Sequence, residues 1–277
     1  MEKLPFTKMH GAGNDFVIVD NRDTRISTEK LIALTPELCR RRFGVGADGL
    51  IALLPPSGTA TDYTMFYRNA DGSDAGMCGN GARCLALFAA RAGLGEQLRF
   101  TVHETTYQAE VNSSEQYITL SFPMQIDVQE IDLPNEFPLF QAHAGTEHIV
   151  RKISPSDLAN DEELKKEGRR LRYHERFNPP GTNVNFICGD DSSDEMQIKT
   201  YERGVEDLTL ACGTGAIASA VVWHQIQNLN ESTEAIKIQA EGGTLDVYFS
   251  YNSDEDVYSD IQLGGEAQFV FEGTYVL

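Results

Sequence analysis

Residues 77–84 read MCGNGARC, and residues 211–218 read ACGTGAIA. Each stretch places Cys-Gly, a polar residue, Gly and Ala at the head of an apolar segment, and the two cysteines are 212 − 78 = 134 positions apart. Segments 80–92 and 214–227 are apolar nearly all round, which predicts two helices buried on most sides. Each of these buried helices would therefore begin at its own cysteine.

The sequence around the two cysteines is similar as well. At the same offset Tyr67 matches Tyr201, and a strand-like segment containing each tyrosine comes before the Cys-Gly motif. The matched order of strand, motif and buried helix favours an internal duplication over chance. Short alternating segments separated by turn residues make up much of the remaining chain. We therefore predict an α+β fold with two pseudo-symmetric domains, each a curved, mainly antiparallel β-sheet or barrel around one central helix.

The expected domains are residues 1–122 and 123–265, with residues 266–277 forming a strand that returns to the first domain. Expected strands cover residues 6–10, 16–20, 49–54, 62–67, 98–103, 107–111, 117–122, 145–152, 183–188, 195–201, 235–239, 244–249, 257–263 and 267–271. A helix is expected over 28–42, divided at Pro36 with Thr35 capping its second part. A charged amphipathic helix is expected over 156–173, and the proline-containing stretch 122–140 is the expected crossover.

Composition narrows the classes of function. The 277 residues carry a formal net charge of −19, which argues against a nucleic acid or an anionic membrane as partner. No apolar run reaches the roughly 20 residues of a membrane helix, and no signal peptide is apparent at the N-terminus. Five cysteines, an odd number, are typical of reduced thiols rather than of a disulfide framework. We expect a cytoplasmic globular protein.

A cysteine at a helix N-terminus has distinctive chemistry. The free N–H groups of the first turn and the positive end of the helix dipole lower a thiol pKa and favour the thiolate. The glycines after Cys78 and Cys212 allow close approach of a ligand, and the same N–H groups can bind a carboxylate. Two such thiols facing one cleft can remove a proton from one face of an α-carbon and return one to the other. Cys39, Cys84 and Cys188 lack this context and are expected to be small buried side chains.

Two other motifs give only weak evidence for a binding site, one for a dinucleotide and one for a metal. The segment 44–49 satisfies GxGxxG, but it follows a helix and opens a strand, the reverse of a dinucleotide fingerprint, so it predicts a tight turn. The segment His103–Tyr107 lacks the second histidine of a zinc protease motif, and there is no C-x-x-C. We expect no metal site.

Several blocks together resemble a known family. MHGAGNDF (9–16), GVGADGL (44–50), YRNADGSDAGMCGNGAR (67–83), NVNF (183–186), YERG (201–204) and ACGTGA (211–216) are similar to diaminopimelate epimerase. The resemblance implies interconversion of LL- and meso-diaminopimelate on the route to lysine and peptidoglycan. It also implies a small-molecule amino-acid substrate and no cofactor, neither pyridoxal phosphate nor metal. A homodimer is the expected assembly.

The resemblance implies roles for individual residues. Cys78 and Cys212 would be the acid/base pair, and His148 would influence the thiols. The backbone N–H groups that would hold the reacting carboxylate belong to Gly79, Asn80, Gly213 and Thr214. The side chains that would contact the substrate are Asn14, Asn69 and Asn183 as neutral groups, Glu202 for an ammonium and for tuning the thiols, and Arg203 for the distal carboxylate.

Departures from the family pattern leave alternatives open. Thr146 and Glu147 stand where the family commonly has Asn and Pro, and Gly49 stands where some members have Gln. One alternative is a racemase or epimerase of another amino acid, of the proline or hydroxyproline type, although Glu202 and Arg203 would have no partner on such a substrate. Another is a non-catalytic, redox-sensing amino-acid binder in which the two cysteines form a reversible disulfide.

Overall fold

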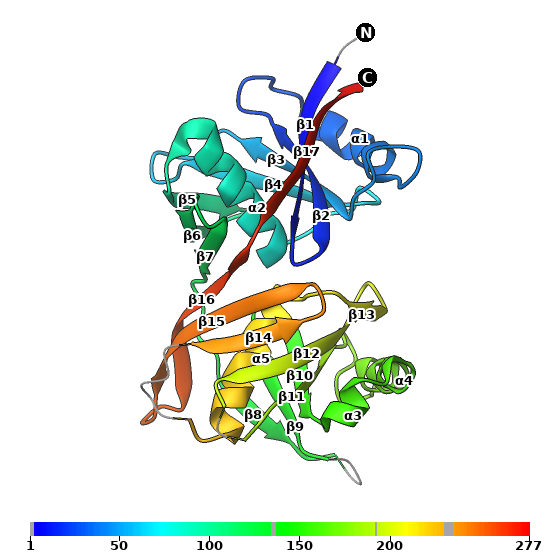
Figure 1. Ribbon diagram of the computed structural model, residues 1–277, viewed down its shortest axis with the longest axis vertical. Coiled ribbons are helices and arrows are strands. Elements are labelled where there is room, and N and C mark those ends of the chain that lie inside the picture. The colour runs from blue at the N-terminus through cyan, green and yellow to red at the C-terminus, as the bar shows by residue number, and fades with distance from the viewer. Residues whose placement is uncertain (1–2, 134–136, 192, 230–234) are drawn as a thin grey trace. The chain divides into compact units, whose positions relative to one another are not determined.

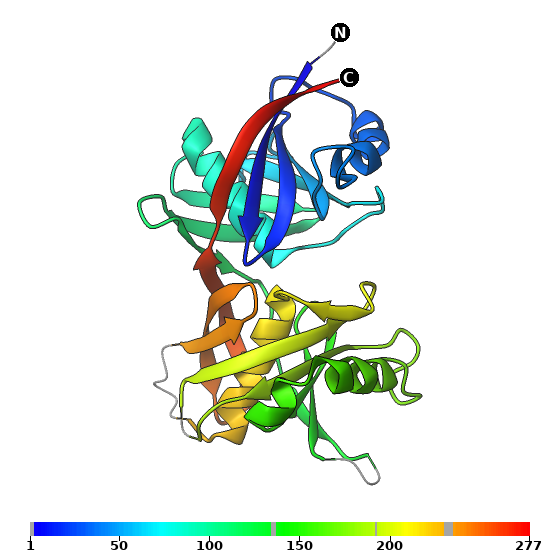
Figure 2. The ribbon, with the colours of Figure 1, turned by 45° about the vertical axis from the view of Figure 1, so that its right-hand side comes forward.

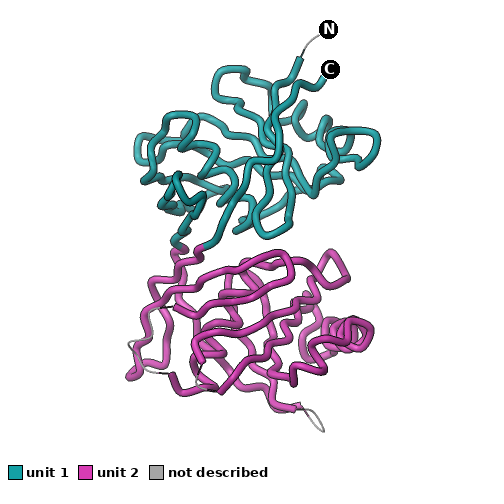
Figure 3. The backbone as a smooth tube through the Cα atoms, viewed as in Figure 1, with its two compact units in different colours: residues 1–121, 265–277 teal, residues 122–264 magenta. Residues whose placement is uncertain are grey.

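The computed structural model describes residues 3–133, 137–191, 193–229 and 235–277 (Figure 1). Its internal contacts separate two compact units. Unit 1 comprises Met1–Ser121 together with Gly265–Leu277, and unit 2 comprises Phe122–Gly264 (Figure 3). Among the described residues, no helix combines the length and the apolar character needed to cross a membrane.

Unit 1 is a curved sheet around a buried helix. Its strands are β1 (Lys3–Gly11), β2 (Asn14–Asp20), β3 (Gly49–Leu54), β4 (Tyr63–Asn69), β5 (Gln97–Val102), β6 (Thr105–Asn112), β7 (Tyr117–Ser121) and β17 (Gln268–Val276). β17 pairs antiparallel with β1, so the C-terminal segment lies beside the N-terminal strand. Helix α2 (Gly79–Ala89) contacts β1, β2, β3, β6 and β7, while α1 (Thr28–Cys39) packs on β3 and β4.

Unit 2 repeats this plan. Its strands are β8 (Val128–Ile131), β9 (Leu139–His143), β10 (Glu147–Lys152), β11 (Asn183–Cys188), β12 (Glu195–Glu202), β13 (Asp207–Thr209), β14 (Ile236–Ala240), β15 (Gly243–Asn252) and β16 (Val257–Glu266). The central helix is α5 (Gly213–Ile226), which contacts β9, β10, β11, β12, β14 and β15. The turned view shows strands curving around this helix (Figure 2). Helices α3 (Pro155–Leu158) and α4 (Asp161–Arg172) contact β11.

The pairing pattern confirms the pseudo-symmetric fold. In unit 1, β1–β2 is antiparallel, β2–β3 parallel, β3–β4 antiparallel, β4–β5 parallel and β5–β6 antiparallel. In unit 2, the pairs β9–β10, β10–β11, β11–β12, β12–β14 and β14–β15 follow the same order of directions. The central helix comes at the same place in each series, and β3 and β11 start 183 − 49 = 134 residues apart. The offset read from the cysteines is therefore the offset of the two folds.

Two helix predictions were wrong in detail. Helix α1 is continuous through Pro36, because Leu31, Leu38 and other residues of one face are buried and hold both halves against the sheet. Thr35 is not a cap; its hydroxyl donates to the carbonyl oxygen of Leu31 at 2.8 Å. The helix expected over 156–173 is two helices, α3 and α4, because the Asn160 side chain accepts from the N–H of Glu163 and starts a new helix.

Other differences concern short strands. The stretch 122–140, expected as a crossover, contains β8 and the first residues of β9, although its residues 134–136 lie outside the described ranges. Strand β13 has three residues, too few for a visible alternation. The first buried helix, expected over 80–92, ends as α2 at Ala89 and is followed by a π-helical turn, Ala90–Leu94, in which Gly93 has φ 90°, a left-handed conformation that a glycine adopts readily.

Candidate active site: two half-sites

The two motif cysteines occupy equivalent positions with nearly the same backbone. Cys78 is the N-cap of α2 with φ −116° and ψ 112°, and Cys212 is the N-cap of α5 with φ −120° and ψ 113°. Each Sγ accepts from the N–H three residues on, that of Gly81 or Gly215, at 3.4 Å in both units. Both cysteines are half-buried. Each sulfur therefore takes the place of a capping oxygen, with the positive end of a buried helix behind it.

The other three cysteines are buried, as expected. Cys39 is 3% exposed, Cys84 0% and Cys188 2%. Burial raises the pKa of Cys39 to about 12 and the pKa of Cys84 further still. These thiols stay neutral at ordinary pH and have no access to a ligand.

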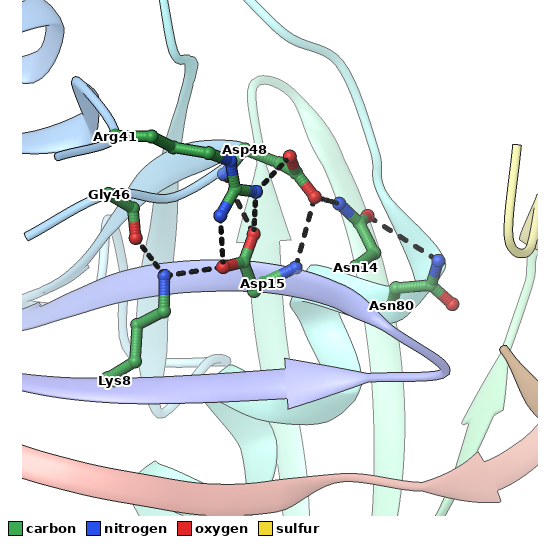
Figure 4. A network of polar contacts seen from close by, with 7 residues as sticks. All are labelled: Lys8, Asn14, Asp15, Arg41, Gly46, Asp48 and Asn80. Carbon is green, nitrogen blue, oxygen red and sulfur yellow. Dashed lines mark hydrogen bonds and ion pairs between the residues drawn. The ribbon is translucent and has the colours of Figure 1, made fainter.

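The Cys78 half-site includes two amides. The Asn14 side-chain N–H donates to Asp48 at 2.7 Å, so its oxygen faces Cys78, with Sγ at 3.7 Å. The Asn80 amide N–H also donates to this Asn14 oxygen, at 3.5 Å (Figure 4). Asn14 therefore presents a carbonyl oxygen rather than an amide nitrogen at Cys78.

A cluster of charges behind Asn14 holds this orientation. Asp48 accepts from Arg41 at 2.8 Å, and Arg41 also donates to Asp15 at 2.7 Å (Figure 4). Lys8, which is 6% exposed, pairs with Asp15 at 2.6 Å. Although burial alone would raise it, the pKa of Asp15 falls to about 2 because Arg41 and Lys8 stabilise the carboxylate. Asp15 is therefore a carboxylate at neutral pH, and Arg41, which donates to both Asp15 and Asp48, holds Asp48 in place.

The Cys212 half-site is built on a buried histidine. His148 is 0% exposed, and its Nε2 lies 3.0 Å from the hydroxyl of Thr214 and 3.0 Å from that of Thr146. The Thr214 hydroxyl is 3.6 Å from Cys212 Sγ. Burial, with electrostatic repulsion from His143 and Arg203, lowers the pKa of His148 to about 3. His148 is therefore a neutral imidazole at neutral pH.

Asn185 determines which tautomer this imidazole adopts. Its amide nitrogen lies 3.0 Å from the carbonyl oxygen of Ile149, so it must be the donor group, and it lies 3.1 Å from His148 Nδ1. Nδ1 therefore accepts, and the ring proton is on Nε2. The Thr214 hydroxyl cannot donate to a protonated Nε2 and is left to donate to Cys212 Sγ. This chain of donors stabilises the anionic form of Cys212.

Thr214→Val should test this chain of donors. Valine keeps the shape and the backbone N–H but removes the hydroxyl, so we expect kcat/KM to fall about tenfold and the Cys212 thiol pKa to rise. Thr214→Ser, which restores the hydroxyl, is the matched control and should stay close to wild type. The pH dependence of Cys212 alkylation and the pH profile of kcat/KM measure both effects. Equal behaviour of the Val and Ser variants would contradict the assignment.

Asn183 and the YERG block lie close to this half-site. The Asn183 amide nitrogen donates to the carbonyl oxygen of Glu147 at 3.0 Å, and its oxygen accepts from the backbone N–H of Arg203 at 2.9 Å. The Arg203 guanidinium donates to the carbonyl oxygen of Gly181 at 3.2 Å. Burial raises the pKa of Glu202. Unit 2 thus brings Asn183, Glu202 and Arg203 together through β11 and the end of β12.

Asn69 lies apart from the amides beside Cys78. Its side-chain nitrogen donates to Ser73 at 3.1 Å in the turn after β4, and its oxygen accepts from Tyr67 at 3.4 Å. The structure therefore holds Asn69 in a turn, and a role at the substrate stays a prediction.

Two of the departures from the family pattern, at Thr146 and Gly49, can be related to contacts in the structure. Thr146 is part of the His148 cluster, where its hydroxyl also accepts from Asn183 at 3.3 Å. A Cβ on Gly49 would lie 2.5 Å from the carbonyl oxygen of Arg68 and 2.5 Å from the Tyr67 ring. A glutamine at position 49 would therefore need a different course of β4.

Both half-sites lie in segments that match a known protein family. A family model described as diaminopimelate epimerase matches residues 6–119 and 140–269, which include both cysteine motifs. The chain belongs to the diaminopimelate epimerase family. Its relatives include the diaminopimelate epimerase of Flavobacterium psychrophilum, 37% identical over 268 residues, or 96% of this chain and 98% of that protein. That of Chlorobaculum tepidum is 40% identical over 282 residues, or 97% of this chain and 100% of that protein.

Solved structures share the fold of this epimerase-family chain at low sequence identity. A PhzF-family phenazine biosynthesis protein of Bacillus anthracis superposes with a TM-score of 0.73 at 14% identity, covering 100% of both chains. A hydroxyproline epimerase of Agrobacterium vitis superposes with a TM-score of 0.69 at 12% identity, covering 98% of this chain and 92% of that one. At these identities the likeness shows the fold alone.

Several polar residues at the half-sites had no role in the sequence interpretation, among them Asp48, Asn185 and Thr200, whose hydroxyl donates to Asn185 at 2.9 Å. Asp48 lies in the 44–49 turn, where only the glycines had drawn attention. Asn185 lies in a strand whose residues are all buried, and a buried amide in an apolar strand is a usable signal. Within the described ranges, no group of three or more His, Cys, Asp or Glu side chains is placed to hold a metal ion.

The glycines at the two helix starts offer a second test. A Cβ on Gly215 would lie 2.5 Å from Asn185 Oδ1 and 3.2 Å from Cys212 Sγ, whereas one on Gly81 would first meet the end of Ile51, at 2.8 Å. Asn185 cannot give way without breaking its hydrogen bonds. We therefore expect Gly215→Ala to lower the free energy of unfolding by about 1–3 kcal/mol and to reduce kcat/KM, despite alanine's higher helix propensity.

Gly81→Ala is the matched control for that substitution. The Ile51 methyl can rotate aside, so the variant should stay within about 1 kcal/mol of wild type in urea unfolding. Equal losses of stability and activity in the two variants would show that Asn185 is not the rigid neighbour.

Proposed function

We propose that this family member interconverts LL- and meso-diaminopimelate, with Cys78 and Cys212 as a thiolate/thiol pair. The observation that carries the proposal is the repeated N-cap geometry of two half-buried cysteines, each inside a segment matched by the family model. The names of the relatives support the substrate. In the proposed reaction one cysteine, as a thiolate, takes the α-proton, and the other, as a thiol, gives a proton to the opposite face. The composition of the substrate is unchanged, and only the configuration at the α-carbon changes.

The helix N-termini supply the stabilisation that this reaction needs. Removing an α-proton places negative charge on the carboxylate, and the first N–H groups of α2 and α5, from Gly79, Asn80, Gly213 and Thr214, are preorganised donors for it. Because the thiol pair supplies both base and acid, the proposed reaction calls for no cofactor. The carbonyl oxygen of Asn14 suits the substrate ammonium rather than its carboxylate.

The polar residues of unit 2 support a substrate with a second amino-acid group. In the proposal Arg203 binds the distal carboxylate, Glu202 binds the distal ammonium and Asn183 adds a neutral contact, while Asn69 of unit 1 adds a second neutral contact. A proline-type substrate has no distal group for the Glu202–Arg203 pair. We further propose a cytoplasmic enzyme that acts as a homodimer, whose product serves lysine and peptidoglycan synthesis.

Deuterium exchange tests the function directly. Purified protein, kept under reducing conditions, is incubated with LL-diaminopimelate in deuterated water. Nuclear magnetic resonance follows the α-protons and chiral chromatography the isomers. We expect meso-diaminopimelate carrying α-deuterium, because a thiol proton exchanges with solvent before it is returned. Parallel incubations with L-proline and trans-4-hydroxy-L-proline should show neither exchange nor inversion.

The outcomes separate the alternatives. Inversion of a proline substrate in place of diaminopimelate would support the racemase alternative. Binding of diaminopimelate without α-deuterium incorporation under reducing conditions would support the non-catalytic binder and contradict the proposed function.

A further inference from the structure

Helix α2 carries a buried arginine that the proposed reaction does not use. Arg83 is 0% exposed, and one terminal nitrogen donates to the Asn80 side-chain oxygen at 2.8 Å. Its Nε and second terminal nitrogen have no hydrogen-bond partner among the described residues. An arginine stays charged in a protein interior, and an unpaired buried charge is costly. A chain that keeps such a charge five residues after Cys78 indicates a role at that thiol.

The guanidinium is the first member of an ordered series of hydrogen bonds. Arg83 donates to the oxygen of Asn80, the nitrogen of Asn80 donates to the oxygen of Asn14, and the nitrogen of Asn14 donates to Asp48. Figure 4 shows the part of this series from Asn80 to Asp48. Each amide turns its oxygen toward the cation and its nitrogen toward the carboxylate. Arg83 and Asp48 thus fix both amides from opposite ends, and the neutral Cys78 thiol donates to the shared Asn14 oxygen at 3.7 Å.

The positive charge of Arg83 lies near groups that can become negative. Described neighbours that can become negative near it include Cys84, Cys78 and Tyr117, and Asp48 is connected to it through the two amides. Cys84 is buried, and burial raises its pKa strongly. A phenol such as Tyr117 is a weaker acid than a thiol. Cys78, half-buried at the helix N-terminus, is therefore the group of these three that ionises most readily.

The matched position in unit 2 shows that the fold itself does not require this arginine. At the offset of 134, Arg83 corresponds to Ile217, which is also buried. There the thiol is supported by a neutral series, from Asn185 through His148 and Thr214 to Cys212. The two units therefore support their thiols by different means.

We propose that Arg83 is a positioning residue of the Cys78 half-site: it orients the Asn80 amide, and its positive charge stabilises the anionic form of Cys78 against the Asn14 oxygen, which favours the neutral thiol. The inference deepens the proposed function, since it concerns the acid/base role of Cys78. Its test uses no substrate, so it fails or succeeds independently of whether diaminopimelate is turned over.

The test is the pH dependence of thiol alkylation. Reduced full-length protein is treated with iodoacetamide, a neutral reagent, from pH 5 to 10, and peptide mass spectrometry reads Cys78 and Cys212 separately. In Arg83→Met the apparent pKa of Cys78 should rise by about one unit, leaving about tenfold less thiolate near neutral pH, while Cys212 is unchanged. Arg83→Lys, which keeps the charge, should stay nearer to wild type than Arg83→Met.

The controls make each outcome decisive. Circular dichroism and urea unfolding check that each variant is folded, and Cys212 reports general damage within the same molecule. An unchanged Cys78 profile in folded Arg83→Met, or equal shifts of both thiols, would overturn the proposal. The pKa of Cys78 in the wild-type protein is a further test that needs no variant. This thiol should titrate below the ordinary thiol value of about 8.5, and a value at or above it would also overturn the proposal.

Discussion

Replacing either Cys78 or Cys212 by alanine is expected to lower the rate of isomerisation roughly 10³- to 10⁴-fold in both directions. Each thiol supplies an acid or base that no neighbouring group can replace, and inversion requires both. The remaining cysteine can still take a proton and return it to the same face. Residual α-deuterium exchange without inversion should therefore be confined to one isomer in each variant, and to opposite isomers in the two variants.

The measurement compares chiral product analysis with proton exchange for both variants, starting from each isomer. Cys188→Ala is the matched control, because Cys188 is a buried thiol of unit 2, 2% exposed, in the apolar cluster around β11. It should keep wild-type kcat/KM and lose about 1 kcal/mol of unfolding free energy. Isomerisation at near wild-type rate in either active-cysteine variant would refute the two-base reaction.

Acid should destabilise the folded protein through His148. The pKa of this imidazole falls from the ordinary value of 6.5 to about 3 on burial, so below pH 6.5 the unfolded chain binds a proton that the folded chain does not. The contribution of neutral His148 to stability is thus fully present above pH 6.5 and is lost as pH falls toward 3. With 1.36 kcal/mol per pKa unit, the loss at pH 4.5 approaches about 2.7 kcal/mol.

Urea unfolding of wild type and His148→Gln between pH 7.5 and 4.5 measures this loss. Glutamine is neutral and can accept from Asn185 and donate to Thr214, so it should remove the titration while keeping the contacts. Glu202, whose burial raises its pKa, contributes with the opposite sign, but it is common to both proteins and cancels in the difference. Asp15, with a pKa of about 2, loses its contribution only below the measured window. Parallel stability curves would contradict a neutral buried His148.

Much of the fold follows from local patterns. The buried helices starting at Gly79 and Gly213 were predicted because N-cap chemistry and apolar periodicity are written into neighbouring residues. Strand β3 and strand β11 were predicted with their observed bounds, Gly49–Leu54 and Asn183–Cys188. Strands β8, β9 and β13, with four, five and three residues, were missed because such short segments carry too little alternation. Local signals also placed a helix break at Pro36, where packing against the sheet keeps α1 continuous.

The candidate site likewise has features that local sequence predicts and features that only tertiary contacts determine. From the sequence alone came the duplication, the offset of 134, the N-terminal placement of Cys78 and Cys212 and the family resemblance, since all of these lie in short ordered blocks. The tertiary structure alone decided how the supporting groups are oriented. Asp48 reaches Asn14 across 34 positions of chain, and Asn185 reaches His148 across 37.

Arg83 shows most clearly what sequence alone does not reveal. It is a charged residue near the start of an apolar helix, and nothing in the sequence was a reason to assign it a role. The fold buries it completely beside Asn80. Burial, amide orientation and tautomer depend on which strands close around a helix, and that is a property of contacts distant in sequence. The sequence thus determined where the two thiols lie, and only the folded chain decided which charges and hydrogen bonds act on them.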